Sequence, residues 1–257
     1  MFYLVQDSTE DRYPALLEAM KKLGIEYEVC KYRPFIHEID FTTKRKDVFC
    51  FGAYDLTGVA EKYDFIPGQM SNDNHNYEIY GRKYGLENML NGDSIVMEFT
   101  DEIPNDTEWD EFFARPTIDQ KIWAGKVFSR DEWNKYVDEC KNNDTTQFIT
   151  DVTKVMISSP KNIEQEIRCW VVGGKVITIS QYKLGYRVIS KNLDHDMEAF
   201  DFAQRMVDKY QTADAFCIDI CRTGKGFKIV EINCINGAGF YHMDCEKLIM
   251  ALENKFN

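Results

Sequence analysis

The last strand pair of the chain constrains its fold most strongly. Two largely apolar runs, AFCIDI and FKIVEIN, flank the turn at residues 223–226, which predicts an antiparallel hairpin. If the tip lies at the Gly-Lys-Gly of that turn, Asp219 faces Glu231 across the hairpin. Because side chains alternate between the two faces of a strand, Asn233 shares a face with Glu231. Three oxygen-bearing side chains are therefore predicted to converge on one face.

Two carboxylates so close together repel each other unless a cation lies between them. Hard oxygen ligands, few of them supplied by protein, suit Mg²⁺ that is held jointly with phosphates. The segment that follows, EINCINGAGFY, places Asn236 before a Gly-Ala-Gly turn whose backbone N–H groups could approach an anion. The alternative is the ordinary polar face of a solvated hairpin, and these residues alone leave it open.

The rest of the chain predicts a mixed α/β (α+β) fold. Strand, helix and strand within the first thirty or so residues form a βαβ unit. Asp7-Ser8-Thr9 offers an N-cap for its helix. Further paired strands and helices follow an acidic segment at 101–107. The expected elements are strands over 2–6, 25–30, 47–55 and 154–160, helices ending at Gly24 and covering 55–62 and 196–210, and hairpins turning at 173–174 and 223–226.

The composition excludes some classes of function. The net charge is −12, with 43 acidic against 31 basic residues. Nucleic-acid binding and docking on an anionic membrane both need cationic surface, so neither partner is expected. No run approaches the roughly 20 apolar residues of a membrane span. The start has no basic n-region, which predicts a cytoplasmic protein whose eight cysteines are reduced and buried.

Taken together, EIN, the following N-x-A-G-F-Y and a strand that carries an Asp resemble the C-terminal metal site of ATP-grasp enzymes. These enzymes typically use ATP and Mg²⁺ to activate a carboxylate as an acyl phosphate. By that resemblance Glu231 and Asn233 ligate Mg²⁺ and Asp219 completes the site. The resemblance also implies an ATP-grasp fold behind an N-terminal βαβ layer. The implied division is an N-terminal domain over 1–100 and an ATP-grasp domain over 101–257, with a lid-like part over 101–160 and a metal-site part over 161–257.

A second element carries the resemblance to a small bacterial and phage clade of this family. RPTIDQKIWAGKVF resembles its Arg-Pro followed by Lys and a short Ala-Gly turn. The resemblance implies that Arg115 and Lys121 reach phosphate oxygens, while Lys126 is expected at the surface. KVMISSP resembles the strand against which the adenine lies, so it implies adenine contacts at Met156, Ile157 and Ser158, although the first two also suit an ordinary core.

The remaining candidate residues follow from the same order of motifs. Glu166-x-Arg168 matches the clade's acidic-x-Arg element, which implies cofactor contact for Glu166 and stabilisation of phosphate charge by Arg168. A cross-strand salt bridge is the structural alternative. Lys183 or Arg187 would hold a carboxylate of the acceptor, and Asn236 would lie at the cofactor.

The sequence thus predicts an ATP- and Mg²⁺-dependent carboxylate–amine ligase, with ATP and a small acid and amine as partners. One alternative is a nucleotide-binding interaction module without catalysis. Another is an enzyme that adds an amino acid to a protein, for which the acidic composition favours a basic partner. The acid, the acceptor and the oligomeric state are not readable from the motifs.

Overall fold

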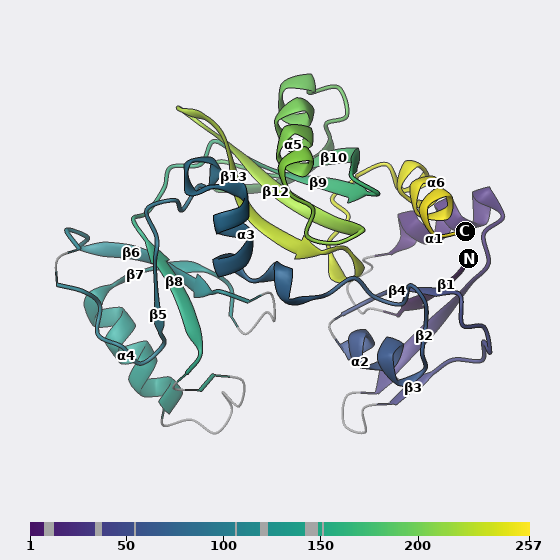
Figure 1. Cartoon of the computed structure of the whole chain (residues 1–257), viewed down its shortest axis with the longest axis horizontal. Coiled ribbons are helices and arrows are strands. Elements are labelled where there is room, and N and C mark those ends of the chain that lie inside the picture. The colour runs from purple at the N-terminus through teal and green to yellow at the C-terminus, as the bar shows by residue number, and fades with distance from the viewer. Residues whose placement is uncertain are drawn as a thin grey trace.

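Three β-sheets lie side by side in the computed structural model of the chain (Figure 1). The structure describes residues 1–7, 13–33, 38–53, 55–105, 107–118, 123–141, 149–150 and 152–257. Within these ranges, no helix combines the length and the apolar character that a membrane span requires. The mixed α/β prediction is confirmed.

The N-terminal sheet has the order β3-β2-β1-β4. Its strands are β1 (Phe2–Gln6), β2 (Tyr27–Arg33), β3 (Glu38–Asp40) and β4 (Val48–Phe51), with helices α1 (Pro14–Leu23) and α2 (Asp55–Lys62) beside it. β1 pairs in parallel with β2 and β4, as the βαβ prediction requires. Helix α1 ends at Gly24, whose φ of 69° is left-handed. The predicted N-cap at Asp7-Ser8-Thr9 is wrong, because α1 begins at Pro14 with Tyr13 before it; Ser8 and Thr9 lie outside the described residues.

The middle sheet has the order β5-β8-β6-β7 and is covered by one long helix. Its elements are β5 (Ile95–Glu98), β6 (Glu111–Pro116), β7 (Lys126–Ser129), β8 (Lys154–Ser158) and α4 (Arg130–Lys141). Ser129 and Glu132 bond each other's backbone N–H groups at the start of α4, at 3.3 and 2.8 Å. Trp133 of α4 is buried among the aromatic residues of this sheet. β5 already belongs to this sheet, whereas the predicted domain division at residue 100 stays a prediction.

The central sheet is entirely antiparallel, in the order β11-β10-β9-β12-β13. Its strands are β9 (Gln165–Val172), β10 (Lys175–Leu184), β11 (Arg187–Asn192), β12 (Ala215–Thr223) and β13 (Gly226–Cys234). Helices α3 (Tyr77–Tyr84) and α5 (Met197–Lys209) pack on one face, and α6 (Cys245–Phe256) packs with α1 on the other. The register pairs Asp219 with Glu231, which confirms the predicted alignment of the last hairpin.

The asparagine-rich segment 71–76 is a set of helix caps. Asn72 accepts a hydrogen bond from the Asn74 N–H at the start of a short 3₁₀ helix (Asp73–His75), and Asn76 caps α3 through the Glu78 N–H. The Asn72 and Asn74 amides also donate to the Thr212 carbonyl, at 3.2 and 3.3 Å. The sequence indicated only a loop here, whereas the run joins α3 to the central sheet.

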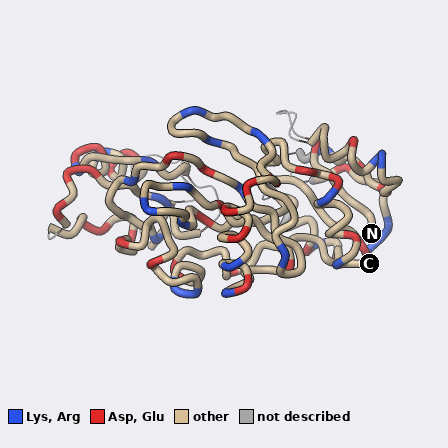
Figure 2. The backbone as a smooth tube through the Cα atoms, turned by 90° about the horizontal axis from the view of Figure 1, so that it is seen from above, with Lys and Arg blue, Asp and Glu red and all other residues tan. Residues whose placement is uncertain are grey.

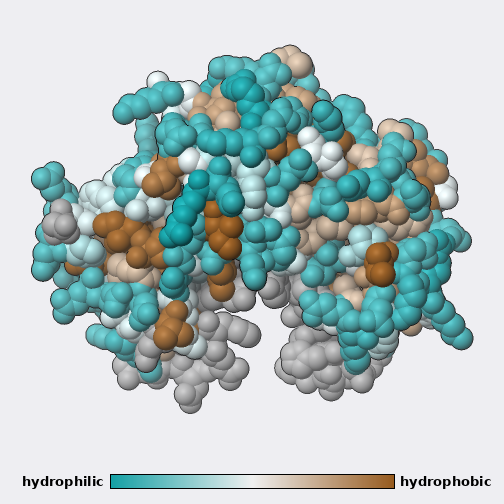
Figure 3. Space-filling view, viewed as in Figure 1, coloured by the Kyte–Doolittle hydropathy of each residue, from teal (hydrophilic) through white to brown (hydrophobic). Residues whose placement is uncertain are grey.

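The surface carries charges of both signs along the whole chain (Figure 2). In Figure 3, hydrophilic residues cover most of the visible face, with a few apolar groups between them. All eight cysteines are unpaired and none is exposed, as predicted. Burial raises the pKa of Cys50 and Cys221 to about 12, so these thiols are protonated and unreactive at neutral pH.

Candidate active site

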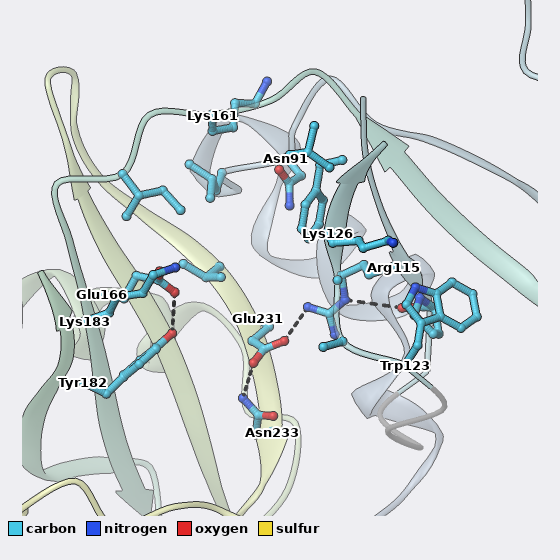
Figure 4. A pocket seen from close by; sticks show the side chains of 18 of the residues that line it. Asn91, Arg115, Trp123, Lys126, Lys161, Glu166, Tyr182, Lys183, Glu231 and Asn233 are labelled. Atoms are coloured by element: carbon cyan, nitrogen blue, oxygen red, sulfur yellow. Dashed lines mark hydrogen bonds and ion pairs between the residues drawn. The ribbon is translucent and has the colours of Figure 1, made fainter. Parts of the chain in front are cut away.

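A cavity of about 540 Å³ lies between the middle and central sheets. The middle unit contributes residues of β6, of β7 and of the turn before it. The central sheet contributes residues of β9, β10 and β13. Figure 4 shows Arg115 and Trp123 on one side of this pocket and Glu166, Tyr182 and Lys183 on the other, with Glu231 and Asn233 between them.

The metal-site prediction places Glu231 at the centre of this pocket. Its Oε1 accepts a hydrogen bond from Asn233 Nδ2 at 3.0 Å, and its Oε2 accepts one from Arg115 Nη1 at 2.5 Å. Arg115 is 116 residues away in the chain and belongs to the other sheet, so this ion pair joins the two walls. Burial alone would raise the pKa of Glu231, but Arg115, Asn233 and Arg168 together hold it below its usual value. Glu231 is therefore ionised at neutral pH.

Asp219 lies beneath Glu231 and is fully buried. Arg168 donates to both of its oxygens, Nε to Oδ1 at 2.8 Å and Nη2 to Oδ2 at 2.7 Å. Asn233 Nδ2 also donates to Oδ2, at 3.1 Å. Burial raises the pKa of Asp219 to about 6 against the opposite effect of Arg168, which leaves the group ionised at pH 7. The cross-strand salt bridge considered from the sequence is therefore present, but Arg168 pairs with Asp219 and not with Glu166.

Glu166 makes a separate cluster on the wall formed by β9 and β10. Its Oε1 forms an ion pair with Lys183 Nζ at 2.8 Å, and its Oε2 accepts a hydrogen bond from the Tyr182 hydroxyl at 2.8 Å. Lys183 lines the pocket, as does Glu166. The Lys183 ammonium is thus held at the pocket wall by a carboxylate.

The donor set fits Mg²⁺. Asp219, Glu231 and Asn233 supply carboxylate and amide oxygens, the ligands that this hard cation prefers. Both hydrogen bonds of the Asn233 side chain are made by its Nδ2, so its Oδ1 remains available as a ligand. No cluster of three or more His, Cys, Asp or Glu side chains with metal-binding geometry occurs among the described residues, which is consistent with a site that uses one amide and shares its cation with phosphates.

Several predicted cofactor residues lie behind the pocket wall. Met156, Ile157 and Ser158 are fully buried, and the side chains that line this region belong to Asn91, Lys161 and Ile163. Ser158 Oγ donates to Asn91 Oδ1 at 3.0 Å, so it supports a lining residue. The adenine contact stays a prediction, and only the backbone of β8 could make it.

Asn236 and Arg187 also lie away from the pocket. The Asn236 side chain accepts from the Met70 N–H at 2.7 Å and donates to the Cys50 carbonyl at 2.5 Å, so it fastens the N-terminal sheet to the end of β13. Arg187 is exposed near the tip of the β10–β11 hairpin. Neither residue lines the cavity. Lys121 lies outside the described residues.

Two lysines of the pocket were missed by the sequence analysis. Lys126, expected at the surface, lines the cavity, and its Nζ lies 4.2 Å from the centroid of the Phe128 ring. Lys161 also lines it and pairs with Asp93 at 2.7 Å. The signal for Lys126 was its place directly after Ala124-Gly125. A Cβ on Gly125 would lie 2.4 Å from the Phe113 ring, so only glycine lets this turn pack against β6.

The backbone beside Arg168 is strained. Tyr241 and His242 follow each other with φ of 47° and 60°, the left-handed region that non-glycine residues seldom adopt. The Tyr241 ring stacks on Tyr182 at 5.1 Å between centroids, and the Arg168 guanidinium carbon lies 5.2 Å from it. Such strain concentrates where a side chain must be held in place. The loop thus fixes one edge of Arg168.

Relief of this strain gives a first prediction. Replacing exposed His242 with Gly should raise the free energy of unfolding by up to about 1 kcal/mol, because glycine adopts the left-handed region without steric cost. The measurement is the melting temperature by calorimetry. His195→Gly is the matched control, since His195 is exposed and has no positive φ, so its replacement should lower stability. Equal losses in both variants would contradict the claim of strain.

Comparison with known proteins gives one family match and many structural matches. Residues 86–252, more than half of the chain, match the model of an ATP-grasp domain family, the third family of its clade. No curated protein matches the sequence.

Among solved structures, D-cycloserine synthetase DcsG has a TM-score of 0.67 at 12% identity, over 100% of this chain and 99% of its own. D-alanine–D-alanine ligase from Bacillus anthracis has 0.61 at 13%, over 99% and 96%. The ATP-grasp ligase PsnB, complexed with a minimal precursor, has 0.61 at 12%, over 100% and 99%. At such identities these three similarities establish the fold.

Proposed function

The chain belongs to the ATP-grasp family, and on that premise we propose that it is a ligase that uses ATP and Mg²⁺ to join a carboxylate to an amine. The predicted family and fold are confirmed by the comparisons. The specific reaction is the proposal. Its main support is the Arg115–Glu231 ion pair, which puts a phosphate-binding cation and a metal-binding carboxylate in direct contact across one pocket.

The proposed roles follow from where each side chain lies. Glu231 and Asn233 would hold Mg²⁺, with Asp219 behind them, and the bound cation would neutralise charge on the ATP phosphates. Arg115, Lys126 and Lys161 would contact the nucleotide, because all three line the pocket. Without ligand, Arg115 and Glu231 neutralise each other, so binding of Mg-ATP would exchange one ion pair for two.

The acceptor side of the reaction is assigned to the wall formed by β9 and β10. Arg168 is held by Asp219, with its guanidinium carbon 5.7 and 5.2 Å from the ring centroids of Tyr182 and Tyr241, and would stabilise charge that develops on the acyl phosphate. Lys183, next to Glu166, would hold a carboxylate of the substrate. No enzyme nucleophile is required, so catalysis would rest on positioning and electrostatics.

The test is a thermal-shift titration with ATP, with and without Mg²⁺. A ligand at a hundred times its Kd stabilises the folded state by about 2.7 kcal/mol, which for a chain of this size is a rise of several degrees. We expect the full rise only when both are present. GTP and Mg²⁺ alone are the controls, and the absence of any shift with Mg-ATP would exclude nucleotide binding at this pocket.

A further inference from the structure

The β10–β11 hairpin exposes an unusual group of apolar side chains. Leu184, Tyr186, Val188 and Ile189 are 48%, 87%, 80% and 41% exposed. β11 is an outer strand of the central sheet. Of the described side chains on outer strands of the three sheets, only those of β11 include more than one exposed large apolar residue. Scattered apolar residues need no explanation, but four within six positions do.

The same hairpin is cationic in an acidic protein. Residues 182–193 contain Lys183, Arg187 and Lys191 and no Asp or Glu, although the net charge of the chain is −12. Lys183 is paired with Glu166, whereas Arg187 and Lys191 form no ion pair with any described residue. The nearest acidic residue outside the pocket is Glu164, whose backbone carbonyl accepts from the Gly185 N–H. Its carboxylate lies near Gly224.

Protection of the sheet edge does not account for this combination. Lysines on an outer strand often prevent a second strand from pairing there. Protected edges avoid large apolar side chains, yet Val188 and Ile189 lie on β11 beside the charges. An outer strand with exposed apolar and cationic side chains is instead suited to pairing with an extended peptide, whose backbone bonds the edge and whose side chains meet both kinds of residue.

We propose that the β10–β11 hairpin binds an acidic, extended peptide segment that belongs to the acceptor substrate of the ligase. The hairpin connects this surface to the pocket, because Tyr182 and Lys183 of the same strand line the cavity wall. A peptide bound along β11 would therefore have its reactive group close to the site of acyl phosphate formation. The inference rests on the proposed ligase function only in naming the peptide as the acceptor. It replaces the basic partner expected from the composition with an acidic one.

The test begins with selection of phage-displayed random peptides on the immobilised full-length protein without nucleotide. We expect enrichment of Asp and Glu interspersed with apolar residues. A synthetic peptide of the enriched sequence, followed by fluorescence anisotropy, should bind the wild-type chain. Val188→Ser and the double substitution Arg187→Glu with Lys191→Glu should each weaken it by about tenfold or more. Val152→Ser and Lys175→Glu are the matched controls, being exposed residues away from this edge, and should leave affinity unchanged.

Three outcomes would overturn the proposal. They are the absence of enriched peptides, enrichment of peptides without acidic residues, and binding that the hairpin substitutions do not weaken. A wild-type dimer that Val188→Ser converts to a monomer would also overturn it, since a second copy of the chain would then cover the hairpin. Melting temperatures confirm that each variant is folded. Phosphate release from Mg-ATP with the selected peptide is measured separately, so peptide binding without turnover would contradict the ligase function and leave the docking surface standing.

Discussion

Replacing Glu231 with Gln is expected to lower phosphate release from ATP by about 10²–10³-fold while the chain remains folded. The substitution keeps the size of the side chain and one carbonyl oxygen, and it removes the negative charge that Mg²⁺ needs as a ligand. It also leaves Arg115 without its carboxylate, although Arg115 keeps a hydrogen bond from its Nε to the Pro116 carbonyl, at 3.3 Å. Steady-state phosphate release with the selected acceptor measures the loss, and calorimetry checks the fold.

Glu78→Gln is the matched control for this experiment. Its side chain is 22% exposed, against 27% for Glu231, and it pairs with Lys154 at 3.1 Å away from the pocket. We expect its turnover to equal that of the wild type, because only charge at the pocket should matter. If Glu231→Gln retained wild-type turnover, Glu231 would not be a metal ligand and the hairpin carboxylates would have only a structural role.

The register of the last hairpin could be predicted because it depends on local rules. A glycine-rich turn fixes the tip, alternation fixes the faces, and together they place Asp219 opposite Glu231. The partner of Asp219 within the sheet was less accessible. Arg168 reaches it because β12 pairs with β9 as well as with β13, and strand order is not encoded in either strand.

The far wall of the pocket could be predicted only in part. The Arg-Pro motif pointed to Arg115, but nothing in the sequence showed that its guanidinium would meet Glu231, 116 residues away. Asn236 was misplaced for a related reason. It precedes a glycine turn, which suggests an anion site, yet the N-terminal sheet packs there and takes up both ends of its amide. Long-range packing decided these cases, and a single sequence does not record it.

Removal of Arg168 should have the largest effect on stability. Arg168→Ala is expected to lower the free energy of unfolding by about 3–5 kcal/mol, because it leaves the fully buried Asp219 carboxylate without its bidentate partner. Urea unfolding at pH 7 measures the loss. Arg222→Ala is the control, since Arg222 pairs with Asp196 and Glu198 at the surface, where ion pairs contribute less than about 1 kcal/mol.

The combination of Arg168→Met with Asp219→Leu separates charge from packing. Replacing both members of a buried pair with apolar residues of similar size is often neutral or stabilising, so the double variant should recover most of the lost stability. It should remain inactive, because the cation beside the pocket and the carboxylate behind Glu231 are both gone. A double variant as unstable as Arg168→Ala would instead assign the loss to the contacts of Arg168 with the rings of Tyr182 and Tyr241. The pair would then be retained for packing, and its proposed role at the acyl phosphate would lose its support.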